Sequence, residues 1–508
     1  MEQVTEFIQG MDFTAKTFAG LEEPLAEELK KLGADNVKII KRGATFKGDE
    51  ELMYKVNYLS RLAIRILKPI GVFEVKSDEQ LYEKVRKINW MNVFKLDQTF
   101  SVEANLFYSD LNHTHYAALK TKDAIVDQFR ESTGKRPWVN VEKPDIYVDV
   151  HISHNVCTIS LDSSGESLHR RGYRIEADKA PINEVLAAGM INLSGWKGDT
   201  DFYDPMCGSG TIPMEAAMLA MNIPAGYYRK NFALMNWEGY NENLWKKVKE
   251  EADKNMGELD CRIFASDRSE KAVGITKRNL KHAGLHKDIE IRVAYFDSIV
   301  PEKGGILIMN PPYGIRMEER GELRDLYKGI GNVLKQNFKG FEAWIISPDF
   351  DTTKFIGLRP SQKITLYNGP LETRFLKFEV YEGTRRYGNT PGEKTIGEEK
   401  QEFRKKDNFR ASKDQKEDGR KRDFDKGKND YRSSNNAKTE DRQRNFREDI
   451  DKPESENRRE VIEKRSRDFD RHMESLRRFT KSDSKKPATK KTGGRKRISD
   501  KESSKDEE

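Results

Sequence analysis

The chain has 508 residues, which is enough for about three domains. Lys and Arg number 92 against 85 Asp and Glu, but residues 401–508 hold 35 of the basic and only 26 of the acidic side chains. Residues 1–400 are therefore slightly acidic as a whole, so a nucleic-acid surface in that part has to be a local patch.

Composition also argues against several classes of protein. The cysteines at 157, 207 and 261 have no paired spacing, which speaks against a disulfide framework and against a zinc site. No apolar run reaches the length of a membrane span, and the first residues lack the apolar core of a signal peptide. We expect a cytoplasmic protein without a metal site or a membrane segment.

Residues 1–68 are predicted to form a small α+β unit. Hydrophobic patterning predicts a strand over 13–18, a helix over 25–32 and a strand over 37–40. The helix is expected to end at Gly33, because glycine often follows a helix C-terminus. Residues 51–67 have apolar residues at helical spacing and are predicted to form a second helix.

Residues 69–163 are predicted to form a second α+β unit. Helices are expected over 81–88 and 120–129, with a strand over 100–104 between them. Alternation predicts a hairpin of 146–152 with 156–161, turning at His154 and Asn155. His151 and His154 are not expected to bind metal, because a strand would place them on opposite faces.

A loop in this unit combines two cations with an aromatic ring. Lys135, Arg136 and Trp138 are suited to contact the phosphates and bases of a nucleic acid. The alternative is a solvated turn with Trp138 buried in the protein, and the local pattern alone leaves both open.

Residues 164–383 alternate strands with helices, as a doubly wound α/β sheet does. Strands are predicted over 202–204, 262–267, 289–295, 305–309 and 343–347, helices over 212–221, 271–282 and 322–337, and a closing hairpin over 364–381. Residues 223–260 interrupt this order. They are expected to pack against the fold, with a role in a substrate cleft as the alternative.

Residues 384–508 are expected to be a disordered charged tail, because few apolar residues stand among dense charges of both signs. Arg-Asp-Phe-Asp occurs at 422–425 and again at 467–470. Phenylalanine beside arginine is suited to transient stacking on RNA, so the tail is a candidate contact for RNA or ribosomal particles. A purely solubilising tail is the alternative.

A glycine-rich turn follows the first predicted strand of the α/β region. It contains Asp204, Cys207, Gly208 and Gly210, and the glycines allow a ligand to approach the backbone. Pro213 replaces the third glycine of a dinucleotide fingerprint, and the lysine of a phosphate-binding loop is absent. The turn therefore suits a cofactor without phosphate, such as S-adenosylmethionine.

Two further acids follow the next strands. Asp267 ends the second strand and is placed to hold ribose hydroxyls, whereas Asp297 follows the third and is placed to accept from an adenine amino group. Because parallel strands end at one edge of a sheet, these acids are expected to lie near the glycine turn.

The fourth strand runs into Asn310, Pro311, Pro312 and Tyr313. The Asn310 side-chain oxygen and the Pro311 carbonyl are suited to accept the two hydrogens of an exocyclic base amine, which directs its lone pair at a methyl donor. Tyr313 is suited to stack on a base flipped out of its helix. The alternative is an ordinary turn that ends a strand.

Together these features resemble a known family. Residues 164–383 resemble a Rossmann-like class I S-adenosylmethionine-dependent methyltransferase of the amine-methylating kind. LHRRGYR at 168–174, APINE at 180–184, HYAALKTKDAIVD at 115–127 and GKRP at 134–137 resemble THUMP-containing RNA methyltransferases. Residues 1–68 then correspond to their ferredoxin-like unit and residues 69–163 to the THUMP domain. The resemblance covers about three quarters of the chain and is strongest to bacterial large-subunit (23S) ribosomal RNA guanine-N2 methyltransferases.

The resemblance implies methyl transfer to a guanine N2 in 23S ribosomal RNA. It assigns the catalytic residues as Asn310, Pro311, Pro312 and Tyr313, the cofactor residues as Asp204, Cys207, Gly208, Gly210, Asp267, Asp297 and Asn183, and the RNA-binding residues as Lys135, Arg136, Trp138 and Arg171. The same chemistry on transfer RNA is an alternative, and a catalytically inactive RNA-binding assembly factor is a second. A DNA adenine methyltransferase is disfavoured by the resemblance of the N-terminal third to an RNA-binding module.

Overall fold

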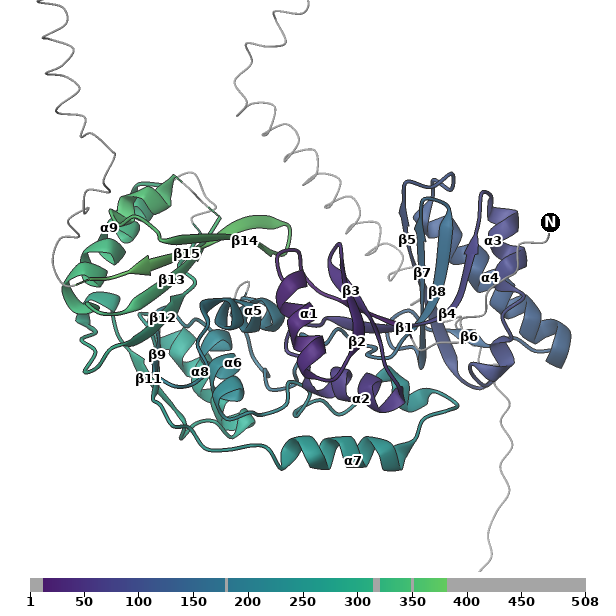
Figure 1. Cartoon of the computed structure of the whole chain (residues 1–508), viewed down its shortest axis with the longest axis horizontal. Coiled ribbons are helices and arrows are strands. Elements are labelled where there is room, and N and C mark those ends of the chain that lie inside the picture. The colour runs from purple at the N-terminus through teal and green to yellow at the C-terminus, as the bar shows by residue number, and fades with distance from the viewer. Residues whose placement is uncertain (1–11, 179–180, 314–319, 349–350, 382–508) are drawn as a thin grey trace, which may run out of the picture. The chain divides into compact units, whose positions relative to one another are not determined.

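A computed structural model describes residues 12–178, 181–313, 320–348 and 351–381, all of which belong to one compact unit (Figure 1). The tail predicted over 384–508 lies outside these residues. No helix of the described part is long and apolar enough to span a membrane.

An eight-stranded sheet occupies the N-terminal part, with the strand order β2-β3-β1-β4-β8-β7-β5-β6. Its strands are β1 (Asp12–Lys16), β2 (Asp35–Ile40), β3 (Gly43–Lys47), β4 (Arg65–Glu74), β5 (Thr99–Phe107), β6 (Trp138–Val139), β7 (Ile146–Ser153) and β8 (Val156–Asp162). The helices of this part are α1 (Glu22–Lys31), α2 (Glu50–Leu59), α3 (Asp78–Val85) and α4 (Thr114–Thr133), with a 3-10 turn η1 (Trp90–Asn92). β4 crosses position 68, so the two units expected from the sequence share a strand.

The predicted hairpin is confirmed. His154 and Asn155 form its turn with φ of +50° and +63°, the left-handed backbone that a tight turn requires. The sequence pattern missed β3, which pairs with both β1 and β2.

The helix predicted over 51–67 is wrong in its second half. α2 ends at Leu59, and Ile66 already belongs to β4. The half-buried carboxylate of Glu28 accepts hydrogen bonds from the Ser60 hydroxyl and from the backbone N–H groups of Arg61 and Leu62. Those two N–H groups are therefore bonded to α1 and cannot continue the helix, a tertiary effect that local spacing does not reveal.

A seven-stranded sheet follows, with the strand order β11-β10-β9-β12-β13-β15-β14. Its strands are β9 (Asp201–Asp204), β10 (Ile263–Asp267), β11 (Ile289–Val293), β12 (Gly305–Met309), β13 (Glu342–Ser347), β14 (Gln362–Asn368) and β15 (Leu371–Glu379). The connecting elements are α5 (Glu184–Ser194), α6 (Thr211–Ala220), η2 (Ala233–Asn236), α7 (Glu242–Asp253), α8 (Glu270–Ala283), η3 (Phe296–Ser298), α9 (Arg320–Asn337) and η5 (Thr352–Ile356).

Helices cover this sheet on both faces, as predicted for a doubly wound fold (Figure 1). β9 to β13 are parallel, and β15 pairs antiparallel with β13. On β12, Ile306 and Ile308 pack toward α5, α6 and α8, whereas Leu307 and Met309 pack toward α9. This alternation of apolar residues explains why the strand reads as a continuous hydrophobic run.

The interruption at 223–260 packs against the N-terminal part. Trp245 of α7 is buried, and its ring contacts Tyr54 and Tyr58 of α2 as well as Phe232. The expectation of a packing role is confirmed for this segment.

Candidate active site

The parallel strands β9, β10, β11 and β12 end at one edge of the second sheet, where a cavity of about 950 Å³ opens. The glycine turn, the end of β10, η3 and residues 310–313 all line it. The structure thus brings together the segments that the sequence pattern places at four strand ends.

The glycine turn leads directly into α6. Gly208 and Gly210 have φ of +55° and +85°. A Cβ on Gly210 would stand 2.6 Å from Thr276 Cγ2, whereas a Cβ on Gly208 would meet nothing within 4 Å. Gly210 therefore allows the turn to pack against α8, and Gly208, which lines the cavity, keeps that space open.

Asp267 links the turn to β10. One carboxylate oxygen accepts from the Gly208 N–H at 3.1 Å, and the other accepts from the Ser269 N–H at 2.9 Å. Thr276 reinforces the turn by donating from its hydroxyl to the Gly208 carbonyl at 2.8 Å. Asp267 still lines the cavity, so it holds the turn and faces a ligand at the same time.

Asp204 lies beneath the turn. Its Oδ1 accepts from the Met206 N–H at 3.2 Å, and its Oδ2 is buried without a hydrogen-bond partner among the described residues. Burial raises the pKa of Asp204 well above its usual value, and the charge of Asp267 adds to the rise. Such a carboxyl has spare capacity for a donor from a ligand.

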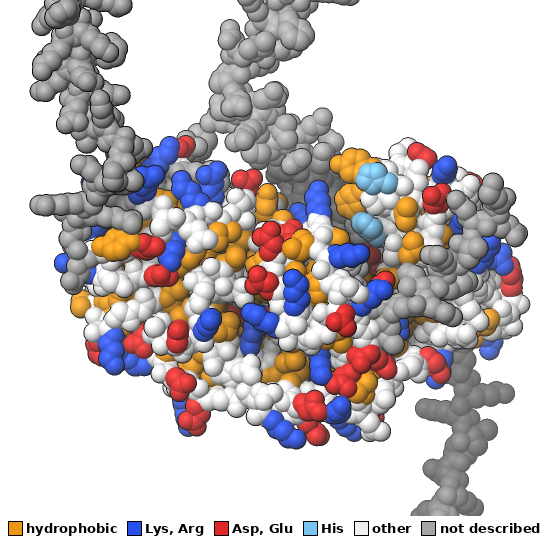
Figure 2. Space-filling view, in the orientation of Figure 1, with side chains coloured by type: hydrophobic (Ala, Val, Ile, Leu, Met, Phe, Trp, Pro, Cys, Tyr) orange, Lys and Arg blue, Asp and Glu red, His pale blue; other side chains and the backbone are white. Residues whose placement is uncertain are grey.

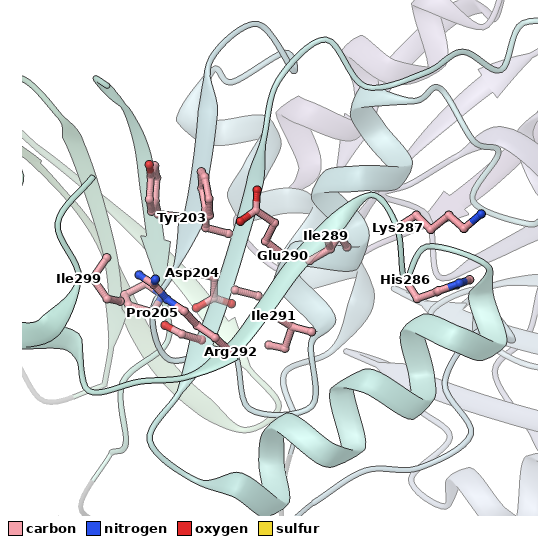
Figure 3. Close-up of a pocket in the computed structure, with 13 residues that line it drawn as sticks. Tyr203, Asp204, Pro205, His286, Lys287, Ile289, Glu290, Ile291, Arg292 and Ile299 are labelled. Atoms are coloured by element: carbon pink, nitrogen blue, oxygen red, sulfur yellow. The ribbon is translucent and has the colours of Figure 1, made fainter. Parts of the chain in front are cut away.

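Asp204 borders a second, smaller hollow rather than the larger cavity (Figure 3). This hollow of about 400 Å³ lies against Tyr203, Glu290 and Arg292, while His286 and Lys287 stand apart from them (Figure 3). It includes neither the glycines nor residues 310–313. We therefore assign cofactor and substrate to the larger cavity.

Asn310, Pro311, Pro312 and Tyr313 form one wall of the larger cavity. The Asn310 Oδ1 atom is buried and has no hydrogen-bond partner among the described residues. The Tyr313 hydroxyl accepts from Asn368 Nδ2 at 3.0 Å, and burial raises the pKa of this tyrosine. The Tyr313 hydroxyl is thus neutral and held by Asn368, and the Asn310 oxygen in the same wall of the cavity lacks a donor among the described residues.

Three further predicted cofactor residues differ in position. Cys207 lines the cavity, and burial raises the pKa of its thiol well above the usual value, so it remains neutral. Asp297 lines the cavity from η3 with an exposed side chain. Asn183 is not among the lining residues. It caps α5 by accepting from the Val185 N–H at 2.9 Å, which accounts for an asparagine at that position.

The structure does not support an RNA contact at Arg171. Its side chain is 1% exposed, it forms an ion pair with Glu215 at 3.3 Å, and it donates to the carbonyls of Leu168 and Arg61. A buried and fully engaged guanidinium cannot reach RNA at the surface. We correct its role to that of a structural residue.

The other predicted RNA-binding residues lie at the surface. Lys135 and Arg136 are exposed after the C-terminus of α4, and within the described residues neither forms an ion pair. Trp138 is 72% exposed in β6, so the alternative of a buried tryptophan is wrong.

The sequence pattern missed several lining residues. Arg268 and Tyr295 follow β10 and β11, and Asn368 is the last residue of β14, just before the hairpin turn into β15. Arg268 is next to Asp267 and Tyr295 is two residues before Asp297, so closeness in sequence to these acids was an available signal. Nothing local distinguishes Asn368, whose partner Tyr313 is 55 residues away.

The lining residues fit a nucleoside cofactor. The cavity falls in the size range of small-molecule sites, the N-terminus of α6 and the open face of Gly208 border it, and two carboxylates, Asp267 and Asp297, stand ready to accept from hydroxyl or amino groups. Ile212, Phe296 and Ile330 supply apolar walls. Asp267 and Asp297 are the side chains best placed to hold such a cofactor.

Family models match three consecutive parts of the chain. Residues 12–67 match an RlmL ferredoxin-like domain, residues 75–162 a THUMP domain, and residues 171–377 an RMKL-like methyltransferase domain.

Individual relatives match over most of the chain. A protein of Synechocystis sp. named "Putative RNA methyltransferase" is 38% identical over 73% of this chain and 97% of its own length. The ribosomal RNA large subunit methyltransferase K/L of Syntrophotalea carbinolica is 39% identical over 73% of this chain, which spans only 54% of that protein.

Solved structures share the same architecture. A "putative methyltransferase complexed with SAH" matches with a TM-score of 0.67 and 30% identity, covering 74% of this chain and 100% of the other. A possible methylase from Clostridium difficile 630 matches with a TM-score of 0.67, 32% identity and the same coverage. The chain belongs to the family of THUMP-containing, S-adenosylmethionine-dependent RNA methyltransferases with an RlmL-like methyltransferase domain.

Proposed function

We propose that the protein methylates the exocyclic N2 amine of a guanine in 23S ribosomal RNA. The observation that carries this proposal is the buried Asn310 Oδ1 atom, which has no donor in the part of the chain that the structure describes, in the same wall as Pro311 and Tyr313. A ligand amine with two N–H groups would supply a hydrogen-bond donor to this oxygen. Ribosomal RNA is favoured because a relative at 39% identity is named a ribosomal RNA large subunit methyltransferase.

The protein's part in the reaction is binding and orientation. S-adenosylmethionine, when bound, supplies a methyl group that is already activated by its sulfonium, and its sulfur would keep the electron pair of the broken S–CH3 bond as a neutral thioether. Asn310 and the Pro311 carbonyl accept the two hydrogens of the amine, so its nitrogen lone pair turns toward the methyl group. Tyr313 stacks on the flipped guanine, and the methylated nitrogen releases one proton to solvent.

The test is methyl transfer by the purified full chain to 23S ribosomal RNA, with transfer RNA assayed alongside. We expect Asn310→Ala to lower kcat at least about 100-fold, as the loss of an aligned hydrogen-bonding group does in other active sites. S-adenosylmethionine affinity should not change in this variant. Asn243→Ala, at an exposed position on α7, is the matched control and should retain parental activity.

Two further results bear on the assignment. Asp267→Ala should weaken S-adenosylmethionine binding, because it removes both the support of Gly208 and a carboxylate of the cavity.

Equal methylation by Asn310→Ala and the parent would contradict the role of the amide. Methylation of transfer RNA alone would move the proposal to that substrate, and no transfer to either RNA would favour an inactive assembly factor.

A further inference from the structure

The tip of the eight-stranded sheet presents exposed rings where β5 ends and the β7–β8 hairpin turns. Phe107 is 51% exposed and Tyr108 is 83% exposed. Tyr108 stacks on His154 with ring centroids 5.1 Å apart and planes 25° apart, and Phe107 contacts His151 at 5.5 Å. Figure 2 shows histidine side chains beside hydrophobic ones on this part of the surface. We call these four residues the ring platform.

Backbone hydrogen bonds and an amide hold the ring platform in place. The His154 N–H donates to the Phe107 carbonyl at 3.1 Å. Asn155 accepts from the Asp110 N–H at 2.9 Å and donates to its carboxylate at 2.8 Å. The end of β5 and the hairpin turn are thus joined, and the rings need little ordering when a ligand binds.

The backbone at the ring platform is strained without a gain in burial. Tyr108 has φ of +50°, a left-handed conformation that is uncommon for a bulky residue, whereas the same φ at His154 belongs to the hairpin turn. Strain of this kind persists where the surroundings impose it, and it clusters at functional positions. Tyr108 leaves most of its ring in solvent, so core packing does not account for the arrangement.

The chemistry of the ring platform favours nucleobases. Flat rings offered by a β-sheet are a recurring means of stacking unpaired bases. Of the acidic side chains near these rings, Asp149 is paired with Lys16 at 2.9 Å, whereas the Asp110 carboxylate accepts from the neutral amide of Asn155 and keeps its charge. Binding there would therefore depend on ring stacking and not on the neutralisation of phosphates.

The ring platform is separate from the loop of Lys135, Arg136 and Trp138. Trp138 pairs with Thr99 at the start of β5, and Phe107 is at its other end. At the rise of a strand, these ends are roughly 27 Å apart. We propose that the ring platform stacks unpaired bases of the RNA substrate at a site distinct from this loop and from the methyl-transfer cavity. This inference rests on the proposed function only in taking RNA as the ligand.

The test is binding of a fluorescein-labelled, non-self-complementary RNA of about 12 nucleotides by the full chain. Tyr108→Ala should weaken binding about fivefold or more, the effect of losing one stacked base. Tyr108→Phe should restore binding to within about twofold, because the ring is kept. Ile39→Ala, at another exposed apolar position on the eight-stranded sheet, should bind like the parent.

Salt dependence separates stacking from charge. The slope of log affinity against log salt should be the same for Tyr108→Ala and the parent, since the ring neutralises no phosphate. A double Lys135→Gln, Arg136→Gln variant should lower that slope. A Tyr108→Ala variant with parental RNA affinity, or one whose lost affinity comes with a lower slope, would overturn the proposal.

Two measurements keep the outcomes distinct. Unchanged S-adenosylmethionine affinity in Tyr108→Ala shows that the methyltransferase domain is folded. Parental RNA binding with an altered sedimentation coefficient would identify the ring platform as a protein interface and refute base stacking. Loss of methylation in Asn310→Ala with normal RNA binding in Tyr108→Ala would leave the proposed function intact and remove only this inference.

Discussion

Two buried oxygen atoms, Asp204 Oδ2 and Asn310 Oδ1, lack hydrogen-bond partners among the described residues. Asp204 is the last residue of β9 and Asn310 comes directly after β12, and these two strands are neighbours in the sheet. Leaving such an atom unsatisfied costs about 1–3 kcal/mol. A ligand in the larger cavity that supplies a donor to Asn310 recovers part of this cost, so the free protein is less stable at this position than its liganded form.

Asp204→Asn should change how stability depends on pH. Because burial raises the pKa of Asp204 in the folded state, that state binds the proton more tightly than the unfolded chain. Stability therefore falls as pH rises above the unfolded value of about 4. An amide cannot ionise, so the melting temperature of Asp204→Asn should rise relative to the parent between about pH 4 and pH 8.

Thermal unfolding of the cofactor-free protein measures this difference. Asp199→Asn removes an exposed carboxyl just before β9 and serves as the control. If the melting temperatures of Asp204→Asn and the parent change with pH in the same way, the Asp204 carboxyl ionises freely in the folded protein and the prediction is contradicted.

Helix α6 is the element that joins the cofactor turn to the N-terminal part. Arg174 donates to the hydroxyl of Thr211, the first residue of α6. Arg61 donates to the carbonyls of Met218 and Ile223, near the C-terminus of α6. Between these ends, Glu215 pairs with Arg171 and accepts from the Tyr173 hydroxyl at 2.9 Å. Residues outside the second sheet therefore fix the helix that begins at the glycine turn.

Breaking the Arg171–Glu215 pair should destabilise the fold strongly. Glu215→Ala leaves a buried guanidinium without its partner, which costs about 3–5 kcal/mol of unfolding free energy. The double variant Arg171→Met, Glu215→Met replaces both charges with apolar side chains and should lose clearly less unfolding free energy than Glu215→Ala. Urea denaturation measures both variants. A double variant that loses as much unfolding free energy as the single variants Arg171→Met and Glu215→Met lose together would contradict the coupling.

Across the whole molecule, sequence reasoning succeeded where structure is set locally. Asp204 and Asp267 are the last residues of their strands and Asn310 directly follows its strand, and the α/β alternation alone places such residues at one edge of a sheet. Predictions from the sequence failed where a residue depends on a contact with a residue far away in the chain. The end of α2 depends on Glu28, the burial of Arg171 depends on Glu215, and the fixed Tyr313 ring depends on Asn368. None of these contacts can be predicted from the residues that precede or follow it in the sequence.

The most direct test of the central claim is nucleoside mass spectrometry of 23S ribosomal RNA and transfer RNA. The RNA comes from a strain that lacks this gene and is complemented with the parent or with Asn310→Ala. We predict that N2-methylguanosine at a defined 23S position is lost in the deletion strain and restored by the parent but not by Asn310→Ala. Unchanged N2-methylguanosine in 23S ribosomal RNA of the deletion strain would contradict the account.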